Sequence, residues 1–148
     1  MPLLEQRRKG GPFMMSGNLF LDLSGPWRLA MGPAESAVFS EETVLLPGTM
    51  DENHKGLDNR DNFSPRYLNR DYVYAGPAVY QREAAVPAEW ADRPIFLRLK
   101  RTKKTRVWVD GQPAGERQNS YTTPHRYELT ALCRPGRAGG LAAGLPKF

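Results

Sequence analysis

Two adjacent carboxylates, Asp51 and Glu52, are the first candidates for acid–base chemistry in this chain of 148 residues. Hydrolysis by a pair of carboxylates requires them to flank one bond at a separation of roughly 5–9.5 Å. Adjacent side chains in an extended segment point to opposite sides, so these two do not face a common substrate. We therefore interpret them as solvated loop charges and assign no catalytic residue.

Metal sites are not favoured either. Asp58, Asn59, Asp61 and Asn62 offer oxygen ligands that Ca²⁺ prefers, but the segment lacks the glycine and spacing of an EF-hand loop, and Arg60 interrupts it. His54 and His125 have no companion histidine or cysteine near them in the sequence, which argues against zinc. We predict no metal and no cofactor. His125, which follows Pro124, is expected to be a turn residue that hydrogen-bonds to backbone.

The cysteine and the common catalytic motifs add no chemistry. Cys133 is the only cysteine, so no internal disulfide forms, and we interpret it as an inert thiol. The sequence contains no GxSxG, no GxGxxG and no P-loop. The signatures of serine hydrolases and of nucleotide-binding proteins are therefore absent.

A basic run is the most visible charge feature of a chain whose net charge is +5. Such a run suggests binding to a polyanion such as nucleic acid. Proteins that bind single-stranded nucleic acid, however, place aromatic residues among their basic residues so that nucleobases can stack on them. This run has no aromatic residue before Trp108. A solvated strand face followed by a charged turn explains the run, so we expect no nucleic-acid partner. Its members are Arg98, Lys100, Arg101, Lys103, Lys104 and Arg106.

The pattern of the chain predicts an all-β fold. Apolar residues alternate with polar ones over short stretches, as in Leu97 and Leu99, and 14 Gly and 13 Pro residues punctuate them. Asp110-Gly111 directly follows such a stretch and predicts a tight hairpin, with a return strand over Gln112–Gln118. Only Ala34–Ser40 and Pro87–Arg93 suit a helical turn. We expect Trp27 and Tyr80 to be buried.

Domain boundaries follow from composition. Residues 18–135 are expected to form one ordered domain, with a long irregular loop over Thr49–Arg70. Residues 1–17 are interpreted as a disordered leader, because Arg7, Arg8 and Lys9 precede no apolar stretch; without a secretory signal we expect a cytoplasmic protein. No apolar run approaches the roughly 18 residues of a membrane span, so no membrane partner is expected. Residues 136–148, rich in Gly and Ala, predict an irregular tail.

Five motifs, in order along the chain, resemble the N-terminal sugar-binding domain of glycoside hydrolase family 2, the family of β-galactosidases and β-glucuronidases. They cover about residues 21–135, and their order and spacing match the family. They are Asp22–Trp27 (DLSGPW), Leu46–Thr49 (LPGT), Tyr74–Arg82 (YAGPAVYQR), Arg106–Gly111 (RVWVDG) and Thr123–Thr130 (TPHRYELT).

This resemblance implies a jelly-roll β-sandwich of the galactose-binding-domain type. In whole enzymes of the family an immunoglobulin-like domain and a (β/α)₈ barrel follow it, and the barrel supplies both catalytic glutamates. A barrel needs about 250 residues, so this chain is interpreted as a fragment truncated before those domains and inactive in hydrolysis by itself. Two alternatives stay open: a stand-alone carbohydrate-binding module without catalysis, and a polyanion-binding protein.

The resemblance also implies site residues. In β-galactosidases of the family an asparagine in the loop before the third motif reaches toward the sugar, and Asn69 occupies that place here, with Arg70 beside it. The other interpretation of Asn69 is that it merely turns the chain. Asn119, in a second polar loop, is a further candidate. The implied partner is a carbohydrate, similar to a β-galactoside or a β-glucuronide; the oligomeric state is left open.

The chain departs from the family pattern after Pro135. The family continues there with a strand of alternating valines, whereas this chain reads Gly136–Leu145 as GRAGGLAAGL. We therefore expect the domain to lack its last strand, through a frameshift or gene end near Gly136. The missing strand would leave a sheet edge or a core groove uncovered.

Overall fold

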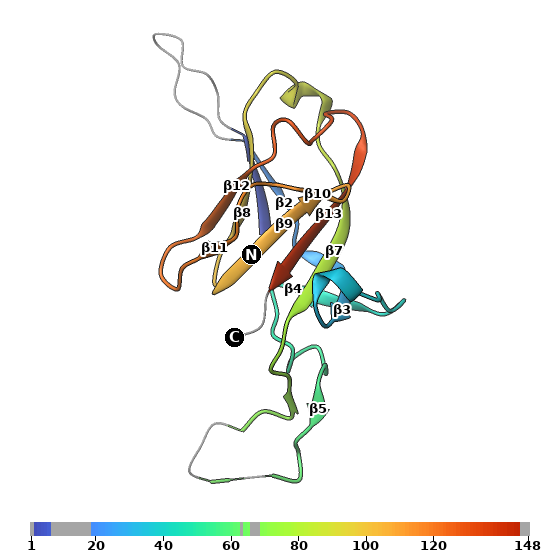
Figure 1. The fold of residues 1–148 in the computed structure, drawn as a ribbon, viewed down its shortest axis with the longest axis vertical. Coiled ribbons are helices and arrows are strands. Elements are labelled where there is room, and N and C mark those ends of the chain that lie inside the picture. Colours follow the sequence, from blue (N-terminus) through green and yellow to red (C-terminus); the bar gives the residue numbers. More distant parts are fainter. Residues whose placement is uncertain (1, 7–18, 63, 66–68, 146–148) are drawn as a thin grey trace.

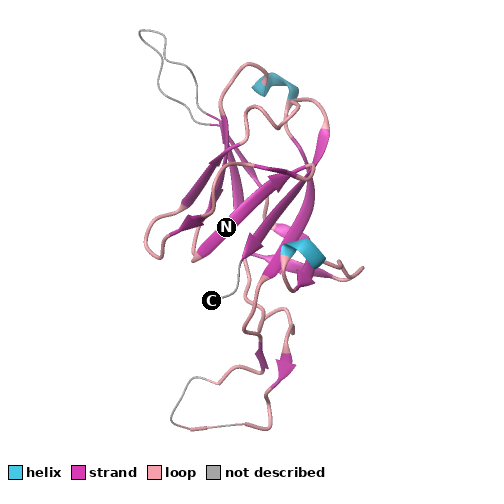
Figure 2. Ribbon diagram, viewed as in Figure 1, coloured by secondary structure: helices cyan, strands magenta, loops and turns pink. Residues whose placement is uncertain are grey.

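The structure is a computed structural model that describes residues 2–6, 19–62, 64–65 and 69–145 (Figure 1). Its regular elements are strands and two single-turn 3₁₀ helices (Figure 2), which confirms the all-β class. The elements are β1 (Pro2–Gln6), β2 (Leu19–Asp22), β3 (Gly25–Met31), η1 (Ala34–Ser36), β4 (Thr43–Leu46), β5 (Leu57–Asp58), β6 (Tyr72–Val73), β7 (Ala78–Ala85), η2 (Ala88–Trp90), β8 (Ile95–Leu99), β9 (Lys104–Val109), β10 (Gln112–Pro113), β11 (Gln118–Asn119), β12 (His125–Glu128) and β13 (Ala138–Leu145).

Two antiparallel sheets enclose one hydrophobic core. The large sheet has the order β10-β9-β13-β7-β3-β4, with β11 also paired to β9, and the small sheet has the order β12-β8-β1-β2. Both sheets contribute fully buried side chains to one cluster, which includes Trp27 and Val107 from the large sheet and Leu4, Leu97 and Tyr127 from the small one. Because the apolar faces of both sheets are covered in this way, the fold is a β-sandwich.

The alternating apolar and polar residues seen in the sequence are alternately buried and partly exposed in the strands. Ile95, Leu97 and Leu99 of β8 are buried, and the residues between them are partly exposed. At the end of β9 the chain turns through Asp110 and Gly111, whose φ values are 49° and 79°. Both values are positive, as the predicted two-residue hairpin requires. The two helical turns also lie where they were expected, at Ala34–Ser36 and Ala88–Trp90.

The return strand after this hairpin is shorter than predicted. Only Gln112–Pro113 and Gln118–Asn119 of the return segment pair with β9. From the first of these pairings to the second, the return segment advances by six residues, whereas β9 advances by four. The extra residues bulge out around Gly115, which has a φ of 82°. A proline and a left-handed glycine in the return segment interrupt the ladder, so the expectation of one strand over Gln112–Gln118 is wrong.

The interpretation of residues 1–17 as a disordered leader is wrong for residues 2–6. These residues form β1, which pairs with β2 on one side and β8 on the other, and the side chain of Leu4 is 1% exposed. The segment has little strand signal of its own, and two open strand edges supply its hydrogen bonds. Residues 7–17 lie outside the described residues.

The expected irregular tail is also wrong for residues 138–145. They form β13, which lies inside the large sheet between β7 and β9, so the place that we expected to be uncovered is filled. Sheet context overrides the low strand propensity of Gly and Ala. Small residues are needed there: a Cβ on Gly144 would lie 2.8 Å from the indole ring of Trp108. Residues 146–148 are outside the described part.

Within the described ranges, no helix has the length and apolar character needed to cross a membrane. The loop over Thr49–Arg70, which we expected to be irregular, extends beyond the sandwich as an arm with one short strand pair, β5 with β6 (Figure 1).

Candidate functional site

The arm is the largest departure from the sandwich, and it carries two of the three predicted site residues. It leaves the large sheet after β4, extends away from the sandwich and returns at β7 (Figures 1 and 2). Leu57 pairs with Val73 and Asp58 with Tyr72 along its stem. Loops of this length inside a small domain are usually either functional or disordered. Because this one carries predicted site residues, we take the arm and the sheet end at its root as the candidate site.

Side chains of the arm satisfy its own backbone at the root. The Asn53 amide accepts a hydrogen bond from the Leu45 N–H at 2.7 Å and donates one to the Leu45 carbonyl at 3.1 Å. The Asp51 carboxylate accepts from the Tyr72 N–H at 2.7 Å and so joins the two halves of the arm. Asparagine and aspartate are favoured in such loops because they replace missing backbone partners.

Glu52 serves the backbone as well. Its carboxylate accepts a hydrogen bond from the Thr49 N–H at 2.7 Å, while the Thr49 hydroxyl accepts from the Glu52 N–H at 3.1 Å. The donor at Thr49 holds the pKa of Glu52 below its usual value. Asp51 and Glu52 are thus anchors of the loop, and they are not arranged as an acid–base pair around a common space.

Asn69 and Arg70 lie at the far part of the arm. The Asn69 amide donates to the Ser64 carbonyl at 2.9 Å and accepts from the Ser64 N–H at 3.3 Å, so both ends of the amide close the loop. These two hydrogen bonds fit the second interpretation of Asn69, in which its side chain turns the chain. Arg70 is exposed, and its carbonyl accepts a hydrogen bond from the Asn59 amide at 3.1 Å. Among the described residues its guanidinium has no partner.

The segment considered for calcium is organised by an ion pair. The Arg60 guanidinium donates to both carboxylate oxygens of Asp58 and lowers the pKa of Asp58 to about 2. It also lies 5.7 Å from the ring centroid of Tyr72. Within the described part of the chain, no group of three His, Cys, Asp or Glu side chains is arranged to hold a metal ion.

A cavity of about 460 Å³ opens at the root of the arm, between the ends of the two sheets. The root contributes Leu46–Thr49 and Glu52, and Trp27 and Tyr80 give the cavity an aromatic wall. The turn at residues 100–102 adds two basic side chains. An aromatic wall with a few polar groups is the usual lining of a site for a small ligand.

The aromatic wall is fixed by its own hydrogen bonds. The Trp27 indole N–H donates to the Leu23 carbonyl at 2.8 Å, and Trp27 is fully buried as predicted. Tyr80 is half-buried and packs against the core cluster; burial raises the pKa of its phenol. The lining thus combines these two aromatic side chains with Glu52 and the basic turn.

Asn119, the third predicted site residue, lies on β11, opposite Lys104 and next to the basic turn. It is exposed, and it belongs to the same end of the sandwich as the cavity. The structure thus places Asn69 and Arg70 together on the arm and Asn119 on another element. Sequence reasoning missed the cavity itself, because its lining comes from segments that are far apart in the chain.

Beside this cavity lies a buried polar cluster. The Ser120 N–H donates to Nε2 of His125 at 3.0 Å, and Nδ1 of His125 contacts the Thr105 hydroxyl. The Thr105 hydroxyl also lies 2.8 Å from the Tyr127 hydroxyl, which donates to the Thr105 carbonyl at 2.7 Å. His125 therefore bonds to backbone as predicted, but it begins a strand, and burial lowers its pKa. With both ring nitrogens engaged, it is a structural histidine.

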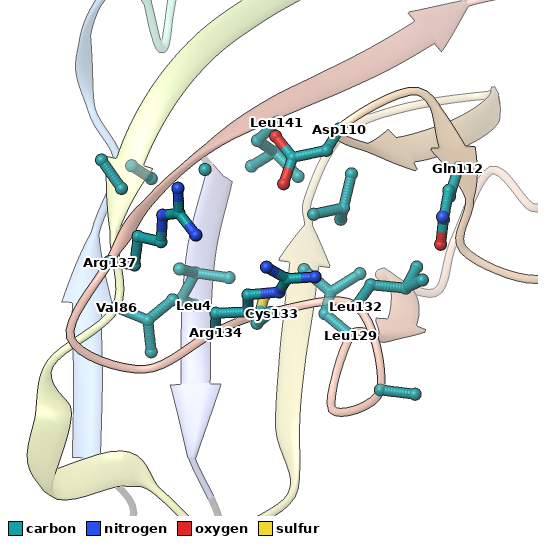
Figure 3. A pocket seen from close by; sticks show the side chains of 15 residues that line it. Leu4, Val86, Asp110, Gln112, Leu129, Leu132, Cys133, Arg134, Arg137 and Leu141 are labelled. Carbon is teal, nitrogen blue, oxygen red and sulfur yellow. The ribbon is translucent and has the colours of Figure 1, made fainter.

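A second pocket, of about 400 Å³, lies at the end of the sandwich opposite the arm. Figure 3 shows the side chains that line it. Leu129 and Leu141 are among its apolar lining residues, and Arg134, Arg137 and Asp110 carry its charges. Burial, helped by the negative charge of Asp110, raises the pKa of the Cys133 thiol to about 11. A thiol with that pKa is protonated at neutral pH and is a poor nucleophile, as the inert interpretation expects.

Comparison with known proteins shows which solved structures share this fold. No family model matches the chain. The β-D-glucuronidase of Dictyoglomus thermophilum matches 98% of the chain with a TM-score of 0.63 and 16% identity, and the match covers 20% of that enzyme. A β-glucuronidase from Ruminococcus gnavus in complex with D-glucuronic acid matches 93% of it with a TM-score of 0.67 and 18% identity, over 23% of that enzyme. This chain therefore has the fold of a segment that makes up about a fifth of these β-glucuronidases.

Proposed function

We propose that this chain is the N-terminal sugar-binding domain of a retaining β-glycosidase of glycoside hydrolase family 2. The observation that carries the proposal is the match of nearly the whole chain to one fifth of β-glucuronidase structures. The five motifs, in family order over about residues 21–135, support it independently. The proposed partner is a β-glucuronide-like or β-galactoside-like sugar.

The role of the domain in this proposal is to shape a sugar pocket. In this proposal the catalytic carboxylates belong to a barrel outside these 148 residues. Asp51 and Glu52 serve the loop instead, since backbone N–H groups donate to both of them. Arg70, exposed on the arm, contributes a charged donor toward the sugar. Asn69 holds the shape of the loop that presents it, through its two hydrogen bonds to Ser64.

Thermal melts with added sugars test the proposal. The 148-residue chain is melted alone and with D-glucuronate, D-galactose or D-mannose, and its hydrolysis of p-nitrophenyl β-glycosides is measured in parallel. A sugar that binds only the folded state at ten times its Kd adds about 1.4 kcal/mol of stability, so one sugar should raise Tm. No p-nitrophenol should be released.

Arg70→Ala should abolish the rise in Tm, whereas Arg134→Ala, a matched exposed arginine at the opposite end, should keep it. If no sugar changes Tm and calorimetry detects no binding, the sugar-binding role is wrong. Hydrolysis by the 148-residue chain would overturn the assignment of catalysis to another domain.

A further inference from the structure

The outer face of the large sheet, which points away from the core, carries a groove that the proposed function does not use. Two cavities of about 620 and 500 Å³ lie along it. Both are within the ~300–1,000 Å³ range of ligand sites. They share five lining residues, so they form one continuous depression, which we call the outer groove. The shared residues are Ala34, Glu35, Val79, Arg106 and Trp108.

The groove exists because β13 has small side chains on its outer face. Leu141 and Ala143 point into the core, so the alternate residues Gly140, Ala142 and Gly144 face outward. These residues lie between β7 and β9, whose outward side chains are larger. A side chain at position 144 would collide with the Trp108 ring, at 2.8 Å from an added Cβ. The absence of a side chain at Gly144 therefore leaves room for the Trp108 ring.

Trp108 is the aromatic centre of the outer groove. It is half-buried, whereas Trp27 and Trp90 are 1% and 2% exposed. Its indole N–H has no hydrogen-bond partner within the described residues, and it is not among the polar atoms shut off from solvent. The Arg106 guanidinium lies 5.7 Å from its ring centroid. A half-exposed ring with a free donor is suited to a ligand that has both an apolar face and polar groups.

Charged groups of both signs surround the ring. Arg106 and the exposed Arg117 supply guanidinium donors beside it, and among the described residues neither has an ion-pair partner. Glu35 and Gln81 supply acceptors on the other side of the groove. Asp110, at the far end, accepts a hydrogen bond from the Gly140 N–H at 2.7 Å. The larger cavity carries two cations against one anion, so it favours a ligand with a carboxylate.

We propose that the outer groove binds an acidic oligosaccharide. A uronate carboxylate pairs with Arg106 and Arg117, its sugar ring packs against Trp108, and hydroxyl groups bond to Glu35 and Gln81. This site is separate from the arm, and it does not depend on the chain's being part of a glycosidase. A neutral aromatic ligand would leave the two guanidiniums of Arg106 and Arg117 unused.

Trp108 provides a direct readout. Because the other two tryptophans are buried, quenching of tryptophan fluorescence by acrylamide reports mainly on Trp108. Trigalacturonate added to the 148-residue chain should reduce this quenching and bind in calorimetry, with an affinity that falls as salt rises. The neutral trisaccharide galactotriose should bind at least about tenfold more weakly, since it lacks the charge-assisted bonds.

Variants locate the site. Trp108→Ala should reduce the affinity for trigalacturonate about tenfold or more, and Arg117→Gln, an exposed change that leaves the fold intact, about fivefold to tenfold. Arg134→Gln, in the second pocket and outside the lining of the groove, should leave it unchanged, and so should Arg70→Ala on the arm. A urea melt confirms that each variant is folded.

Four results would overturn the proposal: no binding of trigalacturonate, equal binding of galactotriose, tighter binding of a single-stranded oligonucleotide, or loss of binding in Arg70→Ala with none in Trp108→Ala. The last result would assign the acidic sugar to the arm. It would therefore separate a failure of the groove from a failure of the proposed glycosidase role, which concerns the arm.

Discussion

The two faces of the large sheet are built from the same strands and differ in almost every other respect. The inner face carries Trp27 and Val107, which are 1% and 0% exposed and closed over by the small sheet. The outer face carries Trp108 and Arg106 of β9, and beside them the small Gly and Ala residues of β13 form the floor of the groove. The inner face is covered by the small sheet, whereas the outer face leaves the Trp108 ring partly accessible to solvent. Two tryptophans in one sheet therefore lie in different environments.

The largest effect should come from truncating the inner tryptophan. Trp27→Ala removes a fully buried side chain and its hydrogen bond to Leu23, and we expect a loss of about 3–5 kcal/mol in the free energy of unfolding. Trp108→Ala should cost less than about half of that, because its ring is half-exposed. Urea denaturation measures both. Equal losses would mean that the two faces do not differ as described.

The fit between Gly144 and Trp108 should give the next effect. Gly144→Val places side-chain atoms where the indole ring lies, and we expect a loss of about 1–3 kcal/mol from overpacking. In the double variant with Trp108→Ala most of this loss should disappear, since the colliding ring is gone. Additive losses in the double-mutant cycle would show that the clash is not with Trp108.

The buried polar cluster should be nearly as sensitive. Thr105→Val leaves His125 and Tyr127 without their shared hydroxyl partner in the core, which should cost about 1–3 kcal/mol. Thr43→Val, the same change at an exposed position on β4, is the matched control and should cost much less. A similar cost at both positions would contradict the stabilising role of the cluster.

His125 should also make stability depend on pH. Its pKa is lowered by burial in the folded state, so on acidification the unfolded chain takes up a proton first. Stability should be at its full value above pH 6.5, the ordinary histidine pKa, and fall as pH decreases from there toward the lower folded-state pKa. Urea midpoints at pH 7.5 and 5.0 measure the fall, which His125→Gln should reduce. His54→Asn, at the exposed histidine, should keep it.

The smallest effect should come from the exposed ion pair between Glu42 and Lys55 at the root of the arm. Lys55 lowers the pKa of Glu42, but solvent screens a pair on the surface. Glu42→Gln should therefore leave Tm unchanged within the error of a melt at physiological salt. A clear drop in Tm would mean that the arm contributes to the stability of the sandwich.

Local patterns predicted some elements well and others poorly. The β8 and β9 strands and the Asp110-Gly111 turn were found from alternation and turn chemistry, which act over a few residues. The five motifs predicted a fold that the β-glucuronidase comparison supports. In contrast, β1 and β13 were missed, because their own residues carry little strand signal. Both are strands because neighbouring strands offer them unpaired edges.

The candidate sites divide in the same way. The sequence located the arm and singled out Asn69, Arg70 and Asn119, but the hydrogen bonds of Asn69 to Ser64 required the folded loop. The cavity at the root of the arm and the outer groove could not be predicted, since each combines segments that are distant in the chain.

By itself, the sequence determined the all-β class, the hairpin at Asp110-Gly111 and the absence of an internal disulfide, because each depends on residue types or short-range spacing. Only the tertiary structure decided the strand order, the position of β13 and the pairing of Gly144 with Trp108. The physical reason is that strand pairing and burial are non-local. A Gly- and Ala-rich segment becomes a central strand only when two partner strands satisfy its backbone on both sides.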